Sequence, residues 1–369
     1  MNLTGILPLT IFREMKMKAL KYLTAYILPA SAVVSFTSEG WLTFLPLIIA
    51  FGLIPGLELL IRPDNSNISE MEEELRKKDR LYDWVIYLVM PLQWLMLLWY
   101  LLSIDQVAFL SVSWWGRTIG MGLLCGVMGI NVAHELGHRR TAFEKFLAKG
   151  LLLTSLYTHF YIEHNYGHHK NVATPEDPAS ARKGESLYAF WLRSIVYSYL
   201  EAWQIEIRRL QRKKRHFISP ANEMLRFTLL QILLILTVYL IFGLQVMIGF
   251  LLAAFIGMLL LETVNYIEHY GLHREKVNDR RYERTTPVHS WNSNHVIGRL
   301  FLFELSRHSD HHAWPHKPYQ LLNSYDDSPQ MPTGYPGMML LSAVPPLWFA
   351  VMHPLINKKP RELRGQVSH

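Results

Sequence analysis

The sequence predicts an all-α integral membrane protein with six transmembrane helices and a cytoplasmic cap rich in histidine. Half of the 369 residues are hydrophobic and 18% are charged, whereas an average soluble domain carries about 25% charged residues. Long apolar runs recur at lengths close to the ~20 residues that a helix needs to cross a bilayer. All seventeen histidines except His353 and His369 lie between His134 and His316. This composition excludes a disordered chain and a small disulfide-stapled fold.

Six apolar runs are the predicted spans. The first is interrupted by Lys21 and Pro29, and the second carries Pro46, Pro55 and Glu58. The basic residues before the first run lead into it without a small-residue cleavage site, so that no cleaved signal peptide is expected. We expect residues 1–369 to form a single membrane domain, with spans at 20–38, 41–61, 82–102, 118–133, 227–242 and 246–264.

The loops between the spans predict the orientation in the membrane. If the N-terminus is cytoplasmic, the far-side connections are residues 39–40, 103–117 and 243–245, and they contain one basic residue, Arg117. The other Lys and Arg residues then lie on the cytoplasmic side, as short loops of membrane proteins require. We therefore expect both termini and the histidine clusters on the cytoplasmic side of the membrane.

Charge and cysteine content exclude other classes. The net charge of +7 follows from the topology, so nucleic acid is not an expected partner. Cys125 is the single cysteine. It cannot form a disulfide framework, a cysteine zinc site or a fused four-cysteine iron domain. An electron donor, if one is needed, would have to be a separate chain.

The first histidine cluster follows the fourth span directly. His134 and His138 are four residues apart, so that on a helix both imidazoles lie on one face and reach one metal ion. A second cluster follows an apolar helix expected over 146–159. It consists of His164, His168 and His169. His164 and His168 are four residues apart and are expected to share one face, and the adjacent imidazole of His169 is expected to turn toward a second ion.

A third cluster consists of His308, His311 and His312, in which the i and i+3 residues are expected to share one face. The sixth span adds His269, which brings the total to nine imidazoles on the cytoplasmic side. Nine nitrogen ligands exceed the needs of one tetrahedral zinc and suit two ions with four or five ligands each. We expect a redox metal, iron first.

Four acids stand next to these histidines in sequence. They are either exposed carboxylates or acceptors that orient the imidazole N–H groups. They are Glu135, Glu163, Glu268 and Asp310. Isolated histidines at membrane edges are usually hydrogen-bonded interfacial residues, and we place His159, His216, His289 and His353 in that class.

Two other functions fit parts of the pattern. His134, Glu135 and His138 match the metalloprotease signature His-Glu-x-x-His, with Glu135 as the general base. An intramembrane zinc protease would use these residues alone and leave the other clusters without a role. A metal sensor or transporter would bind ions without O2-dependent turnover. Metal analysis separates these alternatives, because the protease requires a single zinc.

The order of the three clusters resembles the histidine boxes of integral-membrane non-haem di-iron oxygenases and desaturases. The additional motif Asn265-Tyr-Ile-Glu-His-Tyr-Gly-Leu272 more specifically resembles the bacterial alkane 1-monooxygenase (alkane omega-hydroxylase) family, because desaturases would match the three boxes alone. The resemblance extends from about the third span to Pro354. It also rests on residues 134–138, 172–178, 289–295, 305–313 and 333–337.

The resemblance implies O2-dependent terminal hydroxylation of medium-chain n-alkanes to 1-alkanols at a non-haem di-iron site. Rubredoxin, reduced by its rubredoxin reductase, would supply the electrons, and no rubredoxin domain is fused to this chain. The implied iron ligands are the nine histidines already counted. An unactivated methyl group offers nothing to general acid–base or nucleophilic catalysis, which agrees with a metal enzyme. The alternatives are a related enzyme acting on aromatic methyl groups, such as a xylene-type monooxygenase, or a lipid desaturase or hydroxylase.

Three further regions carry expectations. Substrate is expected to enter sideways from lipid along a path lined by residues such as Trp41, Phe44, Phe51, Leu124, Met128 and Leu261. The basic run 208–215 either docks an acidic electron carrier or lies against anionic lipid headgroups. The apolar run 337–352, broken by Pro345 and Pro346, predicts an interfacial helix or a re-entrant segment.

Overall fold

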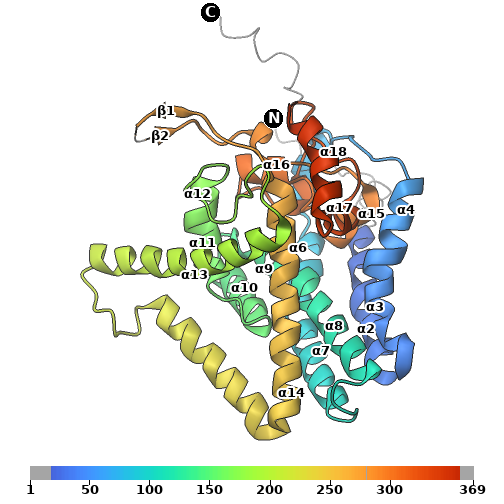
Figure 1. Cartoon of the computed structure of the whole chain (residues 1–369). Coiled ribbons are helices and arrows are strands. Elements are labelled where there is room, and N and C mark those ends of the chain that lie inside the picture. The colour runs from blue at the N-terminus through green and yellow to red at the C-terminus, as the bar shows by residue number, and fades with distance from the viewer. Residues whose placement is uncertain (1–17, 280, 358–369) are drawn as a thin grey trace, which may run out of the picture.

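The computed structural model describes residues 18–279 and 281–357. These residues form a mostly helical molecule, as predicted (Figure 1). The described chain also contains a short antiparallel pair of strands, β1 (Lys276–Asn278) and β2 (Arg281–Tyr282), and irregular segments in the cap. The predicted cytoplasmic position of both termini concerns residues outside the described ones.

Five helical segments of the described chain are long and apolar enough to cross a membrane. They are Lys18–Thr37, Gly40–Leu60, Leu81–Ile104, Val112–Gly137 and Glu223–His269, and they cover all the predicted spans. The first four contain the elements η1 (Lys21–Tyr26), α2 (Ile27–Thr37), η2 (Gly40–Phe44), α3 (Leu45–Ile48), η3 (Ile49–Leu53), α4 (Ile54–Leu60), α6 (Leu81–Tyr87), α7 (Val89–Ile104), α8 (Val112–Leu124), η4 (Cys125–Ile130) and α9 (Asn131–Gly137).

The fifth segment, α14 (Glu223–His269), is interrupted at Gly243. Gly243 has φ 82° and ψ −177°, a conformation that a residue with a Cβ adopts only with strain. The chain reverses direction there, so that the segment consists of two arms (Figure 1). The break falls in the connection predicted between the last two spans.

The segment Val112–Gly137 is the most deeply buried of the five. Small residues allow α14 to approach it closely. A Cβ on Gly122 would lie 2.6 Å from Ile256 Cγ2, and one on Gly257 would lie 2.5 Å from Cys125 Cβ. Close helix packing is therefore the role of these glycines. The segment carries the π-helical turn η4 between α8 and α9.

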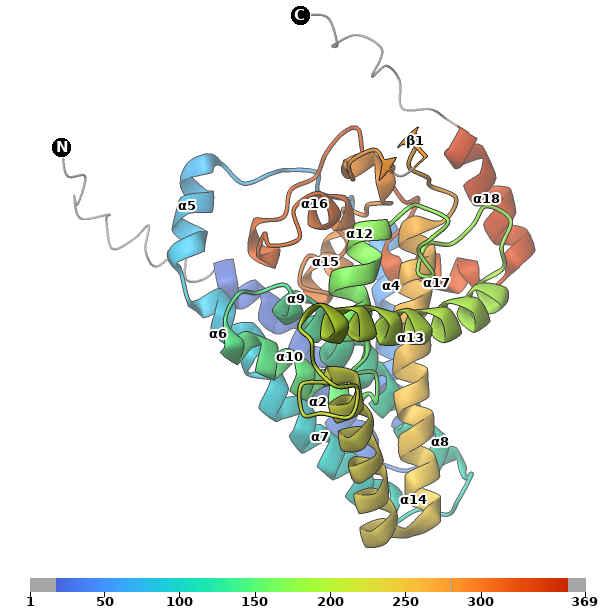
Figure 2. The same cartoon turned by 90° about the vertical axis from the view of Figure 1, so that its left-hand side faces the viewer.

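The remaining helices form the cap and its supports. Helix α13 lies across α14 and projects from the bundle at its C-terminal end (Figures 1 and 2). One face of it is buried, with Phe190, Ser194 and Ala202, whereas the apolar residues Leu192 and Val196 on another face are exposed. The bounds are α5 (Glu70–Lys78), α10 (Ala142–Thr154), α11 (Phe160–Glu163), η5 (His164–His168), α12 (His169–Asn171), α13 (Leu187–Arg212), η6 (Pro287–His289), α15 (Val296–Phe301), α16 (His308–Ala313), η7 (Tyr319–Leu321), α17 (Tyr335–Ser342) and α18 (Pro345–Asn357).

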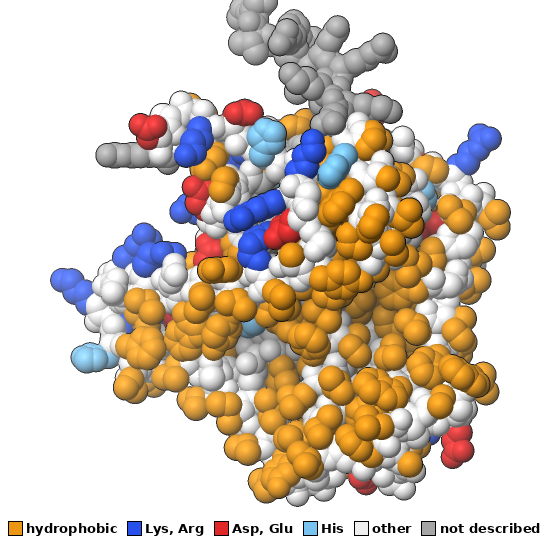
Figure 3. Space-filling view, viewed as in Figure 1, with side chains coloured by type: hydrophobic (Ala, Val, Ile, Leu, Met, Phe, Trp, Pro, Cys, Tyr) orange, Lys and Arg blue, Asp and Glu red, His pale blue; other side chains and the backbone are white. Residues whose placement is uncertain are grey.

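The C-terminal apolar run forms α17 and α18, which meet at the proline pair. Trp348 and Met352 of α18 are buried in a cluster with Tyr266 and Tyr270 of α14. Neither helix belongs to the described segments that are long enough to span a membrane. On the face shown in Figure 3, hydrophobic side chains cover the lower part of the molecule, and most charged side chains lie around the cap and α13. This distribution fits a protein held in a membrane below its cap.

Candidate metal centre

The nine histidines singled out in the sequence meet in two groups. In each group one ring nitrogen per histidine lies within 4.8 Å of the others. We call them the five-histidine group, which is His134, His138, His164, His169 and His311, and the four-histidine group, which is His168, His269, His308 and His312. All are buried except His169, which is partly exposed.

The first pair is positioned as predicted. His134 lies in the last turn of α9 and His138 caps that helix, with ring centroids 5.0 Å apart. The π-helical turn η4 immediately precedes α9. Such turns insert an extra residue into a helix and are frequent at functional sites.

The second cluster differs from the expectation that the i and i+4 residues share an ion. His164 and His169 belong to the five-histidine group, with their Nε2 atoms 3.0 Å apart, whereas His168 joins the other group. The cause is the π-helical turn η5, His164–His168. A π turn bonds residue i to i+5, which brings residues five apart to the same side.

The third cluster also differs from its predicted pairing. The sequence predicted that His308 and His311 would share one face, but His308 shares its group with His312, and His311 joins the five-histidine group. Helix α16 begins at His308. In regular α-helical geometry the i and i+4 side chains lie nearest to the same face. His308 and His312, four residues apart, therefore stay together, and His311, three residues from His308, lies in the other group.

The arrangement of ring nitrogens fits bound cations. Nε2 atoms face each other at 3.1 Å between His138 and His164, at 3.2 Å between His269 and His308, and at 3.3 Å between His168 and His312. The Nε2 atom of His134 is buried and has no hydrogen-bond partner. Facing lone pairs repel unless a proton or a cation lies between them. Imidazole nitrogen is a ligand that suits iron, zinc and copper.

Burial favours the neutral form of five of these imidazoles. It lowers the pKa of the histidines outside the membrane segments well below the usual range, and neighbouring imidazoles lower it further; these are His164, His169, His308, His311 and His312. A neutral ring has a lone pair available to a metal ion. These five histidines can therefore bind a metal ion at neutral pH without first releasing a proton.

A carboxylate that the sequence analysis missed supports the four-histidine group. Asp177 Oδ2 lies 2.9 Å from Nδ1 of His168, whose Nε2 faces His312. Burial raises the pKa of Asp177, but His168 and Ser180 outweigh it and hold this pKa below its ordinary value. An acceptor on the outer nitrogen fixes the tautomer and orientation of a ligating imidazole. In the sequence, Asp177 lies within residues 172–178, which contributed to the family resemblance but had no assigned role.

Among the four acids predicted to orient histidines, Glu268 lies in the centre itself. Its Oε2 atom is 3.1 Å from Nε2 of His308, the nitrogen that also faces His269, and its Oε1 accepts a hydrogen bond from Tyr335. Glu163 is buried with one oxygen unpartnered. Two acids hold other segments instead: Glu135 accepts from Arg139 and the Tyr319 amide, and Asp310 accepts from Lys317, Asn323 and Tyr325.

The isolated histidines stay outside both groups. His289 contacts Glu283 and Thr286, and His353 pairs with the hydroxyl of Tyr270. His159 packs against aromatic rings, and His216 is exposed.

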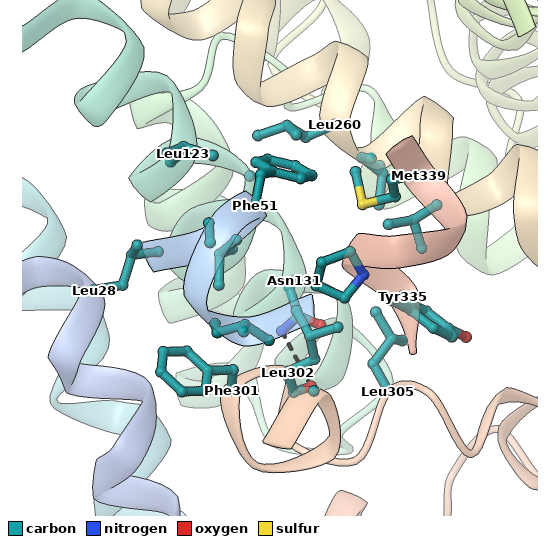
Figure 4. A pocket seen from close by; sticks show the side chains of 18 residues that line it. Leu28, Phe51, Leu123, Asn131, Leu260, Phe301, Leu302, Leu305, Tyr335 and Met339 are labelled. Atoms are coloured by element: carbon teal, nitrogen blue, oxygen red, sulfur yellow. Dashed lines mark hydrogen bonds between the residues drawn. The ribbon is translucent and has the colours of Figure 1, made fainter. Parts of the chain in front are cut away.

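An apolar cavity lies beside the centre, between α4, the η4 region, α14, α15 and α17 (Figure 4). Phe51 and Leu261 line it as predicted, but Trp41, Phe44, Leu124 and Met128 do not. The helix that carries Leu124 and Met128 turns a neighbouring face to the cavity, and Trp41 is 78% exposed. The lining includes Leu123, Gly126, Val127, Asn131, Leu260, Leu302, Leu305 and Met339.

The fold and the histidine motifs define the class of protein. The sequence profile of the fatty acid desaturase family matches residues 112–342, and the chain belongs to this family. Relatives narrow the class, because the chain is 44% identical over 315 residues to alkane 1-monooxygenase 1 of Pseudomonas aeruginosa, covering 84% of this chain and 82% of the relative. It is 41% identical to an alkane 1-monooxygenase of Acinetobacter baylyi, covering 81% and 73%. Within the desaturase family it therefore belongs to the alkane 1-monooxygenases, which are oxidoreductases.

A more distant relative acts on a different substrate class by its name. The xylene/toluene monooxygenase hydroxylase component of Pseudomonas putida is 28% identical over 240 residues, covering 64% of this chain and 63% of the relative.

Proposed function

We propose that this chain hydroxylates the terminal carbon of medium-chain n-alkanes. One oxygen atom of O2 enters the C–H bond to give the 1-alkanol, and the other leaves as water after uptake of two electrons and two protons. The observation that carries the proposal is an apolar cavity beside a cluster of nine histidines, and smaller cavities that share Asn131 with it reach these histidines. The alkane 1-monooxygenases that match more than four-fifths of the chain support an alkane as the substrate.

The proposed cofactor is a pair of iron ions, one in each histidine group. Iron bound there supplies the redox chemistry that activates O2 toward an unactivated C–H bond. The count supports two ions, because nine nitrogen ligands exceed one coordination sphere. Asp177 holds the ring of His168, and the Tyr335 hydroxyl holds the carboxyl group of Glu268.

The residues of the cavity are proposed to bind and orient the substrate. Their side chains exclude water and align a hydrocarbon chain with its end toward the histidines. Transfer of an alkane from water to the bilayer or the cavity is favourable by about 0.8 kcal/mol per CH2. Glu58, an acid within an apolar run, is buried and accepts a hydrogen bond of 2.8 Å from the Gly298 amide. It thereby ties α4 to α15 at the cavity wall.

Six membrane crossings are the proposed topology. A straight helix of 47 residues would be ~70 Å long at ~1.5 Å per residue, more than twice the ~30 Å hydrocarbon core. The reversal at Gly243 divides it into two arms that each match one crossing. The distribution of Lys and Arg supports an inner-membrane location with the histidine cap on the cytoplasmic side.

Helix α13 is proposed to lie in the cytoplasmic interface of the bilayer. Its exposed apolar residues, such as Leu192 and Val196, suit lipid, and the basic run 208–215 suits anionic headgroups. Rubredoxin, reduced by its reductase, is the proposed electron donor. We propose that it approaches the side of the cap where His169 is partly exposed, because the other eight histidines are buried.

Whole-cell conversion of a ladder of n-alkanes, with rubredoxin and its reductase co-expressed, tests the proposal. Production of 1-alkanols and about two irons per chain would support it. The distant xylene-monooxygenase relative makes aromatic methyl groups the second candidate, so p-xylene is tested in parallel. Iron without any alcohol would favour a lipid desaturase, and a single zinc would favour the protease.

A further inference from the structure

Asn131 stands where the apolar cavity meets the metal centre. It is the first residue of α9, one helical turn before His134. It lines the main cavity and also two smaller cavities that reach the histidines. One of these is bordered by His134 and His311, and the other by His164 and His308. A hydrocarbon chain that passes from the cavity to the centre passes this side chain.

The polarity of Asn131 is exceptional in this place. Among the described residues that line the main cavity, the other polar side chain is that of Tyr335, whose hydroxyl donates to Glu268. The Nδ2 group of Asn131 donates to the carbonyl oxygen of Leu302 at 3.2 Å (Figure 4). Its carboxamide oxygen has no hydrogen-bond partner among the described residues. The cavity therefore contains one open acceptor next to the reacting end.

A hydrocarbon substrate cannot donate a hydrogen bond to this acceptor, but the alcohol product can. Hydroxylation gives the chain a single polar O–H group, in surroundings where an unpaired hydroxyl is strongly disfavoured. We propose that the carboxamide oxygen of Asn131 accepts a hydrogen bond from the hydroxyl of the product alcohol. Asn131 is thus a product-binding residue that draws the new hydroxyl away from the histidines. This inference rests on the proposed hydroxylation.

A purely structural role would need only the Nδ2 group. The bond to Leu302 fastens α9 to the loop between α15 and α16, and its loss would disturb alkane and alcohol binding alike. A receptor for the hydroxyl has a different consequence, because only alcohol binding depends on the oxygen. The ratio of the two affinities therefore separates the roles.

The experiment measures two constants on the full-length enzyme in membranes with its electron donor. These are KM for n-decane and the inhibition constant of 1-decanol, in the wild type and in Asn131→Leu, with iron per chain as a check of folding. Leu is close in size to Asn and has no acceptor. We expect the ratio of the inhibition constant to KM to rise about fivefold to tenfold, the value of one hydrogen bond, because the loss of the bond to Leu302 affects both constants and cancels in the ratio.

Val127→Leu is the matched control, since Val127 also lines the cavity one turn earlier in the same helical segment. It alters the cavity shape and should shift both constants by the same factor. An unchanged inhibition constant in Asn131→Leu, or an equal shift of both constants, would overturn the inference.

A second measurement needs no variant. In the wild type, 1-decanol should inhibit about fivefold more strongly than a methyl ether of equal chain length, which has no O–H to donate. Equal inhibition would overturn the inference, while conversion of n-decane in the same preparation would leave the proposed function intact. A wild type that makes 1-alkanol from no n-alkane would overturn both.

Discussion

The two histidine groups are built from similar motifs but have different surroundings. The four-histidine group is fully buried, and two carboxylates reach it: Asp177 contacts His168, and Glu268 contacts His308. The five-histidine group includes the partly exposed His169. Among the described residues no carboxylate hydrogen-bonds to its imidazoles, which pack against one another edge to face.

The two groups therefore differ in how firmly their imidazole rings are oriented and in how easily the protein surface is reached from them. Asp177 fixes the orientation and raises the basicity of the His168 ring from its outer nitrogen, and Glu268 adds a carboxylate at the centre itself, so the four-histidine group should hold its ion more tightly. The five-histidine group has the shorter route to the surface. One ion would thus be the more firmly held and the other the more readily reached, although the sequence motifs look alike.

Loss of a ligand tests whether both groups are needed. We expect His269→Ala and His311→Ala, one from each group, each to lower turnover more than ~100-fold, since even outer partners of ligands are worth about 10- to 100-fold. Iron per chain should fall from about two to about one. His216→Ala, at an exposed position, serves as the control. Full turnover in either variant would remove that group from the chemistry.

Removal of the Asp177 carboxylate tests the support of the four-histidine group. We expect Asp177→Asn to weaken metal binding or turnover about 10- to 100-fold, because the outer nitrogen of His168 loses its anionic acceptor. Asp310→Asn is the matched control. Asp310 is adjacent to His311 in sequence but bonds to Lys317 and Asn323. If both variants bind metal equally well, the contrast between the groups is wrong.

Chelation tests the difference in access. A chelator should remove iron in two phases, the first from the five-histidine group, and each loss should lower thermal stability. Binding at a free metal concentration 100 times Kd stabilises a fold by about 2.7 kcal/mol. Iron content and unfolding temperature are followed together. Simultaneous loss of both ions would show that the exposure of His169 does not control release.

The smallest effect on turnover is expected for a buried ion pair outside both groups. Glu304 pairs with Arg299 at 2.6 Å and accepts from the Tyr22 hydroxyl. Burial raises the pKa of Glu304, but Arg299 and Lys21 outweigh it and hold this pKa below its ordinary value. Its stabilisation is therefore complete above the ordinary glutamate pKa and is lost as the pH falls through the lowered value.

Glu304→Gln should accordingly reduce stability by about 3 kcal/mol at neutral pH, with metal content unchanged. The difference from the wild type should shrink in acid, as unfolding at several pH values would show. A loss of iron in this variant would contradict the separation of this contact from the centre.

Much of the site could be predicted because its signals are local. Histidines recur at helical spacings, and nine converged without exception into the two groups. Apolar runs located every candidate span, since hydropathy is read residue by residue. The break at Gly243 also fell where the charge pattern required a connection.

The division of the second cluster between the groups could not be predicted from regular spacing. It depends on the π turn at His164–His168, which regular helical periodicity does not contain. The division of the third cluster follows the regular i and i+4 spacing of α16. The cavity lining was predicted only in part, because hydropathy does not tell whether an apolar residue of a span faces a cavity, a neighbouring helix or lipid. Asp177 meets His168 through a loop, and helix propensities say nothing of such contacts.

The two π turns beside the histidines make the length of these segments as important as their chemistry. Each residue of an α-helix advances the chain by about 100° around its axis. Deleting one residue from Cys125–Ile130 would remove the residue that widens the turn, so that a regular helix forms and His134 and His138 keep their face, while Gly126 and Val127 shift at the cavity wall. A one-codon deletion there would thus change the cavity and spare the ligands, whereas the same deletion between His134 and His138 would rotate one ligand away from the other.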